Sequence, residues 1–268
     1  MIVDFEYAGE RLSDYGLIIA SVDGASGSNV LEWGSQLEFQ TIQNKNTGIS
    51  YATSVGYSDV YSTSFQVIKY SCRTGNMEYI TDTEFRYLVK WLNRKTYQNF
   101  SPISNNEKFC GYHFYGSFNA KPIVIGGNII GLELTFTSNA PYAFGDTVNI
   151  DITTDSFDVY CISDEIGQQP IKMTVKTSKA GQLTILNSAY DKATVIKNCT
   201  KDETITIDSE NLIITSSNST HKKLYNDFNY IYPKLINDYD NSVNTFTFSM
   251  PCEVHLEYRP IRKVGVVV

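Results

Sequence analysis

Apolar and polar residues alternate with a period of two along most of this 268-residue chain, which is typical of β-strands with one buried face. Stretches rich in Gly, Asn, Asp and Ser separate the alternating runs and predict turns. In the first half, the predicted strands are Ile2–Tyr7, Gly16–Val22, Leu37–Thr41, Thr63–Tyr70, Tyr112–Phe118, Pro122–Ile125 and Gly131–Thr137. A turn at Gly126, Gly127 and Asn128 predicts that the last two strands form a hairpin.

Residues 81–95 depart from this pattern and predict an amphipathic helix. Thr81 and Glu84 have the spacing of a capping box, which satisfies backbone N–H groups at a helix N-terminus. The apolar residues then repeat at i, i+3, i+4 and i+7: Phe85, Leu88, Val89 and Leu92. We therefore expect one face of this helix to lie on a sheet.

The second half of the chain repeats short strands with no helix of any length between them. The predicted strands are Ile171–Val175, Gln182–Leu186, Ala193–Ile196, Thr204–Ile207, Leu212–Thr215, Thr245–Phe248 and Val254–Tyr258. Turn residues separate most of them at intervals of roughly ten residues, which is typical of an antiparallel β-sandwich.

A domain boundary is predicted where Pro141 and Gly145 interrupt regular structure. The length of 268 residues also favours two domains over one. We therefore expect a β domain with one helix over residues 1–143 and a second β-sandwich over residues 144–268.

Composition and charge narrow the functional classes. A hydrophobic fraction of 42% and a charged fraction of 19% are those of an ordinary globular protein. The net charge is −7, and acidic residues outnumber basic ones in both halves. Because phosphate neutralisation by Lys and Arg supplies most nucleic-acid affinity, the chain is a poor candidate for tight DNA or RNA binding.

The sequence also bears on the cellular compartment. Residues 1–7 lack the basic start and apolar stretch of a signal peptide, and the apolar segment 122–134 is too short to span a bilayer. The five cysteines are widely spaced, without a C-x-x-C pair: Cys72, Cys110, Cys161, Cys199 and Cys252. We expect free, mostly buried thiols, no membrane association, and synthesis in a reducing cytosol.

Several phrases, in their order along the chain, resemble the distal tail proteins of long-tailed phages and related prophage elements. The first phrase comprises Phe5, Tyr7 and Gly9, followed by residues 13–17 (SDYGL). The second is residues 139–143 (NAPYA), at the predicted domain boundary. The third group comprises residues 203–208 and 226–230, then Pro233 and Leu235, then residues 258–260 (YRP). The resemblance covers the whole chain.

The resemblance implies a structural tail component rather than an enzyme. It predicts an N-terminal β-sandwich with one helix and a hairpin arm that embraces a neighbouring subunit, followed by a galectin-like β-sandwich. Six copies are expected to close into a ring at the virion tail tip, after assembly in the host cytoplasm. The implied partners are the tail tube protein, the tail-tip, tape-measure and receptor-binding or baseplate proteins, and DNA only as passing cargo.

Two segments are candidates for the arm. The polar, Gly-containing segment Gln43–Asp59 is our first choice, and Asn105–Phe118 is the alternative. A solvent loop is an equally good interpretation of each.

Candidate catalytic and metal-binding residues are sparse. The histidines His113, His221 and His255 lie far apart, and none has a neighbour at metal-ligand spacing. The sequence lacks a nucleophile elbow, a P-loop and a dinucleotide-binding glycine fingerprint. We therefore predict no catalytic, cofactor-binding or metal-binding residues.

Acidic clusters offer weaker candidates. Asp164 with Glu165, and Asp202 with Glu203, are adjacent along the chain, so their side chains are expected to point to opposite faces of a strand. An oxygen-rich stretch has the ligand types of a Ca²⁺ loop without its glycine and terminal glutamate: Asn237, Asp238, Asp240 and Asn241. We interpret it as a solvated loop.

A carbohydrate-binding module is the main alternative function, and a β-sandwich glycan-cleaving enzyme is a third. Galectin-type sites use an H-x-N-P-R phrase and a stacking tryptophan, but this phrase is absent and both tryptophans, Trp33 and Trp91, fall in the first half. Stacking faces remain available from four aromatic residues: Tyr225, Phe228, Tyr230 and Tyr232. Their density favours a packed core edge or a protein-docking surface.

Overall fold

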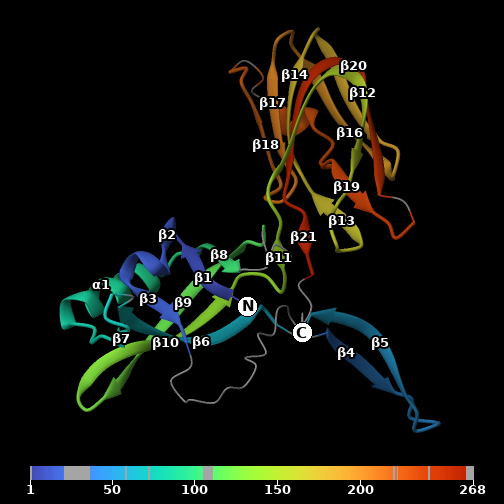
Figure 1. Ribbon diagram of the computed structural model, residues 1–268. Helices are drawn as coiled ribbons and strands as arrows, with labels where there is room; N and C mark the ends of the chain where they lie inside the picture. The colour runs from blue at the N-terminus through green and yellow to red at the C-terminus, as the bar shows by residue number, and fades with distance from the viewer. Residues whose placement is uncertain are drawn as a thin grey trace. The chain divides into compact units, whose positions relative to one another are not determined.

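The structure is a computed structural model that describes residues 2–20, 37–57, 59–71, 73–104, 111–219, 221, 223–240 and 242–263. The chain divides into two compact units, of which the first runs to Phe144 and the second comprises Gly145–Arg262. Antiparallel strands dominate both units (Figure 1), which confirms the mainly-β fold class.

The first unit contains one large sheet, a separate hairpin and one long helix. Its strands are β1 (Ile2–Tyr7), β2 (Glu10–Arg11), β3 (Leu17–Ile19), β4 (Leu37–Gln43), β5 (Ser50–Tyr57), β6 (Ser62–Ser71), β7 (Asn76–Met77), β8 (Gln98–Ser104), β9 (Phe114–Ile125), β10 (Asn128–Ser138) and β11 (Ala143–Phe144). The helical segments are the 3₁₀ turn η1 (Leu12–Tyr15) and helix α1 (Asp82–Leu92). The large sheet has the order β2-β1-β8-β9-β10-β6-β3, with β7 paired to β6.

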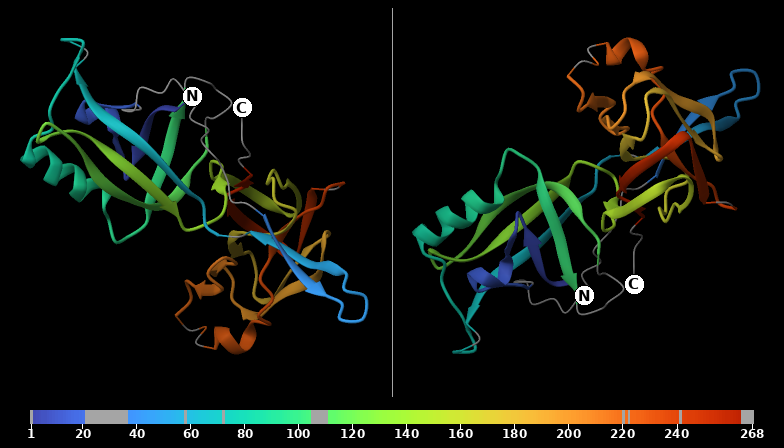
Figure 2. Two further views of the ribbon diagram at one scale, coloured as in Figure 1. Left: turned by 90° about the horizontal axis from the view of Figure 1, so that it is seen from below. Right: turned by 90° about the horizontal axis from the view of Figure 1, so that it is seen from above.

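This sheet curls so that its two halves face each other, as Figure 2 shows from two further sides. Strands β1 and β6 are four strand spacings apart along the sheet, or roughly 19 Å if it were flat. Yet the rings of Phe5 on β1 and Phe65 on β6 lie 5.7 Å apart, centroid to centroid. The core of the predicted sandwich therefore forms inside one curled sheet, and it is filled largely by aromatic rings.

Helix α1 covers part of this core. Thr81 caps its N-terminus, and the capping box with Glu84 is present. Leu88, Trp91 and Leu92 are buried, and the Trp91 indole N–H donates to the Tyr7 carbonyl at 2.9 Å. The helix that the apolar spacing predicts is therefore present, but it ends at Leu92 rather than residue 95.

Strands β9 and β10 form the predicted hairpin. Gly126 and Gly127 occupy its turn with φ angles of 59° and 85°, a left-handed conformation that glycine adopts without steric cost. A second glycine requirement lies inside the sheet, because a Cβ on Gly116 would fall 2.2 Å from the Thr137 carbonyl oxygen. Glycine is therefore needed at the turn of the hairpin and at Gly116 inside the sheet.

The second unit is built almost wholly from strands. They are β12 (Val148–Tyr160), β13 (Gly167–Pro170), β14 (Lys172–Thr177), β15 (Gly181–Asn187), β16 (Tyr190–Cys199), β17 (Thr204–Asp208), β18 (Ile213–Ser216), β19 (Lys234–Asn237), β20 (Val243–Tyr258) and β21 (Ile261–Arg262). Helix α2 (Leu224–Asp227) is a single turn. The main sheet has the order β16-β15-β20-β14-β17-β18, with β12 also paired to β20, and β13 pairs with β19 in a small separate sheet.

Strand β20 organises the second unit. Its first half pairs with β15 and its second half with β14, while β12 runs along its other edge. Buried residues alternate along nearly all of its sixteen residues, so one face lines the core throughout. The prediction that Thr245–Phe248 and Val254–Tyr258 are separate strands is wrong, because both belong to this one strand.

Candidate functional site

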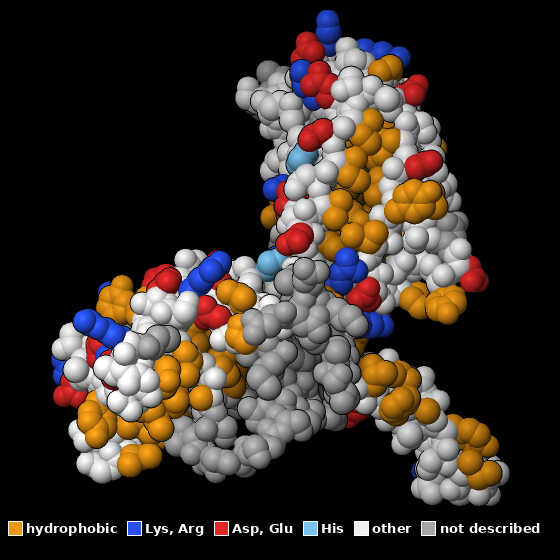
Figure 3. All heavy atoms as spheres, in the orientation of Figure 1, with side chains coloured by type: hydrophobic (Ala, Val, Ile, Leu, Met, Phe, Trp, Pro, Cys, Tyr) orange, Lys and Arg blue, Asp and Glu red, His pale blue; other side chains and the backbone are white. Residues whose placement is uncertain are grey.

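Strands β4 and β5 form a hairpin that makes a two-stranded sheet of its own. Apart from the half-buried Tyr57, every residue of both strands is exposed. The exposed residues include large apolar side chains, whose contact with water is unfavourable. The most exposed of them are Leu37, Phe39, Ile42, Tyr51 and Val55, each between 54% and 64% exposed. Figure 3 shows these hydrophobic groups along the hairpin. We call residues 37–57 the arm.

Apolar pairs lie on both faces of the arm. Residues directly opposite each other share a face, so Phe39 pairs with Val55 on one side. Ile42, which faces Tyr51, lies three residues further along β4 and therefore points to the other side. Glu38 and Gln40 alternate along β4 on the same side as Ile42, so this second face is mixed, and apolar side chains are exposed on both faces.

The arm is longer than the segment that the sequence predicted. Its turn comprises residues 44–49, where the Gly48 N–H donates to the Asn44 carbonyl at 2.8 Å. The choice of Gln43–Asp59 therefore captured the turn and the second strand but missed the first, Leu37–Gln43. The alternative, Asn105–Phe118, was wrong where it is described, because Phe114–Phe118 belongs to β9 of the main sheet; residues 105–110 lie outside the described residues.

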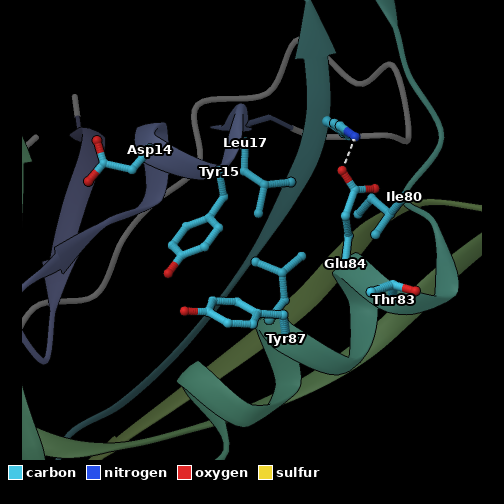
Figure 4. A pocket seen from close by; sticks show the side chains of 9 residues that line it. Asp14, Tyr15, Leu17, Ile80, Thr83, Glu84 and Tyr87 are labelled. Atoms are coloured by element: carbon cyan, nitrogen blue, oxygen red, sulfur yellow. Dashed lines mark hydrogen bonds and ion pairs between the residues drawn. The ribbon is translucent and has the colours of Figure 1, made fainter.

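A groove lies between η1 and β3 on one side and α1 on the other. It has a volume of about 380 Å³ and is lined by Asp14, Tyr15, Leu17, Lys69, Ile80, Thr83, Glu84, Tyr87 and Leu88. Figure 4 shows the hydroxyls of Tyr15 and Tyr87 at one end and Glu84 toward the other. The Lys69 ammonium lies 2.6 Å from Glu84, and this hydrogen bond lowers the pKa of that carboxyl to about 2. We call it the α1 groove.

The three histidines occupy separate places, as the sequence predicted. His113 contacts the Ser101 hydroxyl through Nδ1 at 2.8 Å, and His255 contacts the exposed Asp151 carboxylate at 2.7 Å. His221 lies in a cluster of its own in the second unit. Within the described ranges, no group of three or more His, Cys, Asp or Glu side chains has the arrangement of a metal site.

The His221 ring is buried between two carboxylates. Its Nδ1 lies 2.7 Å from Glu203 and its Nε2 lies 3.1 Å from Asp227. Burial by itself lowers the pKa of His221, but the two carboxylates outweigh it and raise the pKa above the ordinary value. Glu203 also accepts the Thr200 backbone N–H and the Ser216 hydroxyl, and its pKa is lowered despite burial. Both ring nitrogens are occupied, so this cluster offers no free base.

The acidic pairs do not converge on a common site. Glu203 is buried in the His221 cluster, whereas its neighbour Asp202 is exposed at a turn. Asp164 lies 3.1 Å from Arg262. In the oxygen-rich stretch interpreted as a solvated loop, the Asn237 amide nitrogen donates to the Ser163 and Glu165 carbonyls, so Asn237 is a structural link. Asn241 lies outside the described residues.

The aromatic segment 225–232, which begins within α2, divides into packed and exposed rings. Phe228 is buried in the core and contacts the Tyr232 ring at 5.0 Å. Tyr225 and Tyr230 are 60% and 63% exposed. The segment therefore contains a packed core edge, as one of the two alternatives predicted, together with two exposed rings, and the protein-docking surface stays a prediction.

Comparison with known families decides the class of protein. Residues 1–140 match a family described as the phage tail protein N-terminal domain, and residues 142–258 match one described as the phage tail C-terminal domain. The chain belongs to this phage tail protein family. A search of curated proteins found no match.

A solved structure shares the fold of this tail protein. The Dit protein of phage SPP1, described as a paradigm of the hub adsorption apparatus in phages that infect Gram-positive bacteria, is 16% identical. The alignment covers 97% of this chain and 99% of that chain, with a TM-score of 0.66. A chain of the phage P2 baseplate is 9% identical with a TM-score of 0.47, over 98% and 99% of the two chains. The resemblance to distal tail proteins is confirmed, and the likeness to SPP1 Dit is one of fold.

The tail protein is a structural component of a phage tail. No helix among its described residues has the length and apolarity needed to cross a membrane. Cys161, Cys199 and Cys252 are free and buried, and burial raises the pKa of the Cys199 and Cys252 thiols to about 11. Trp33, Cys72 and Cys110 lie outside the described residues.

Two features of the tail protein were missed in the sequence. The α1 groove joins Tyr15 to Tyr87, residues 72 positions apart whose rings lie 5.9 Å apart, and no local pattern links them. The Glu203, His221 and Asp227 cluster was equally hidden, although each residue was visible as a polar interruption between strands. The exposed first strand of the arm carried a signal, because Leu37, Phe39 and Thr41 alternate with polar residues.

Proposed function

We propose that this tail protein forms a hexameric ring that joins the tail tube to the tail tip or baseplate and lets DNA pass through its channel. One observation carries the proposal: the arm exposes apolar pairs on both faces and pairs with no other described strand. The fold shared with the SPP1 Dit protein supports it. The mild net negative charge of −7 is compatible with a channel that does not retain DNA.

The physical argument starts from the instability of an isolated hairpin. A two-stranded hairpin is marginally stable in water unless another surface covers it. Contacts around a closed ring are head-to-tail, so each copy must present two different patches. The arm supplies one patch that reaches outward, and the body of a neighbouring copy supplies the other.

The proposed surroundings follow from this role. The ring would contact the tail tube protein on one side and tail-tip, tape-measure and receptor-binding or baseplate proteins on the other, at the virion tail tip after assembly in the host cytoplasm. The units up to Phe144 and from Gly145 are proposed to act as separate domains, of which the first closes the ring. We assign no catalytic, cofactor-binding or metal-binding residue to this function.

The ring is tested by removing the apolar character of the arm. The double variant Phe39→Ser, Ile42→Ser is expected to stay folded, because both side chains are already exposed, but to remain monomeric. Light scattering gives the mass and negative-stain electron microscopy shows rings. Gln40→Ser, at an exposed polar position of the same strand, is the matched control. A double variant that assembles like the unchanged protein would exclude the arm as the ring contact.

Carbohydrate binding by the second unit is the second candidate, and the exposure of Tyr225 and Tyr230 favours it. Aromatic faces provide flat apolar surfaces on which sugar rings stack. A glycan array would test it: binding that Tyr225→Ala abolishes supports the candidate, and an array without binding counts against it.

A further inference from the structure

The α1 groove has the character of a docking site for a protein side chain. Leu17, Ile80 and Leu88 provide apolar lining, while Tyr87 is 56% exposed at the rim. Its volume of about 380 Å³ lies at the small end of the roughly 300 to 1,000 Å³ typical of ligand pockets. It has room for a few side chains rather than for a whole secondary-structure element.

The charged side chains of the α1 groove indicate which kind of side chain it would bind. Glu84 neutralises Lys69, so the cation of the groove is already paired and an anionic ligand gains little there. Asp14 lies at the tyrosine end, where its carboxylate accepts the Arg11 backbone N–H at 3.3 Å, and among the described residues no ion pair of this carboxylate with a cationic side chain is found. Two tyrosine rings next to a carboxylate favour a cation flanked by apolar groups.

The tip of the arm has this chemistry. Lys45 lies in the turn, and the large apolar residues closest to it along the chain are Ile42, Ile49 and Tyr51, between 52% and 64% exposed. A strand of eight residues spans roughly 26 Å, enough to carry the tip well away from the base of the arm. None of the residues that line the α1 groove comes from the arm of the same copy.

We propose that the arm tip of one copy docks in the α1 groove of a neighbouring copy, with Lys45 near Asp14 and the tip's apolar side chains over Tyr15 and Tyr87. The inference rests on the proposed ring, and it adds the surface that receives the arm. Burial of the tip's apolar side chains stabilises the contact, and the Lys45 charge orients it.

Site-specific photocrosslinking on the full-length protein tests this contact. A benzophenone amino acid replaces Tyr87, and isotopically labelled and unlabelled copies are mixed so that mass spectrometry separates crosslinks between copies from those within one copy. We expect crosslinks between copies that map to residues 42–51. Lys45→Glu should lower the yield several-fold, whereas Lys192→Glu, an exposed lysine of the second unit, should leave it unchanged.

Light scattering on the same samples separates this inference from the ring itself. Ring-sized particles whose crosslinks map outside residues 42–51, or only within one copy, overturn the groove inference and leave the ring in place. Particles that stay monomeric at high protein concentration, without crosslinks between copies, overturn both.

Discussion

His221 shows how two neighbouring carboxylates set the charge of a buried ring. A neutral imidazole has one N–H donor, yet acceptor groups lie at both of its nitrogens, Glu203 at 2.7 Å and Asp227 at 3.1 Å. The protonated ring satisfies both contacts. The cluster therefore holds together the turn that carries Glu203, the loop that carries His221 and the end of α2.

Stability of the second unit should consequently depend on pH. Because the pKa of His221 is raised in the folded state, its contribution is fully present below the ordinary value of 6.5 and is lost as pH rises through the raised value. The pKa of Glu203 is lowered, so its contribution is present above 4.5 and is lost as pH falls through the lowered value. We expect the cluster to stabilise the folded state most between pH 4.5 and pH 6.5, where both contributions are fully present.

Glu203→Gln tests the assignment of this effect. The variant removes the charge of the nearer carboxylate, so the pKa of His221 should fall toward its ordinary value in an NMR titration. Thermal melts should then lose less stability between neutral and alkaline pH than those of the unchanged protein. His255→Gln, which removes an exposed ring beside Asp151, is the control and should change little. An unchanged His221 titration in Glu203→Gln would refute the role of Glu203.

In helix α1, the local sequence pattern predicted the position of the helix but not all of its buried residues. The capping box and apolar spacing located the helix, whereas Trp91 was not on the predicted face and proved to be buried against Phe5 and Tyr7. The long indole ring reaches the curled sheet from a position that periodicity leaves at the edge of the apolar stripe.

Leu88→Asp should unfold the first unit. Leu88 is 3% exposed, so the substitution places an unpaired carboxylate in an apolar core, at a cost of about 3–5 kcal/mol. Circular dichroism melts would show an early or absent transition, with the variant recovered in the insoluble fraction. Arg86→Asp, at an exposed position of the same helix, should melt within about 0.5 kcal/mol of the unchanged protein. A soluble, cooperatively melting Leu88→Asp variant would contradict the packing of α1.

The strands that the sequence analysis missed share a weak local signal. Strand β12 is polar at most positions and carries Asp151, Asp155 and Asp158, and β8 contains Pro102. In β20, Pro251 separates two apolar runs without breaking the strand. These segments become strands because neighbouring strands pair with their backbones, β20 with β12 and β1 with β8, which is a tertiary effect that overrides propensity.

The division into two units predicts that the second one folds without the first. Residues 145–262 have their own core, which includes Val175, Ile205 and Leu256. Expressed alone, this fragment should be soluble, show the circular dichroism of a β protein and melt cooperatively. It should also remain monomeric in light scattering, because it lacks the arm. Ring formation by the fragment would show that the ring contacts lie in the second unit.

The sequence by itself determined the mainly-β class, the single long helix, the β9–β10 hairpin and the resemblance to distal tail proteins. The first three depend on neighbours in the chain, because alternation, capping and turn residues act over a few positions, whereas the resemblance depends on the order of short phrases along the chain. Tertiary structure alone decided that one sheet curls into the first core, that His221 meets Glu203 and Asp227, and that Tyr15 meets Tyr87 in the α1 groove. Those contacts join residues between 6 and 72 positions apart, and only the packing of whole elements brings such residues together.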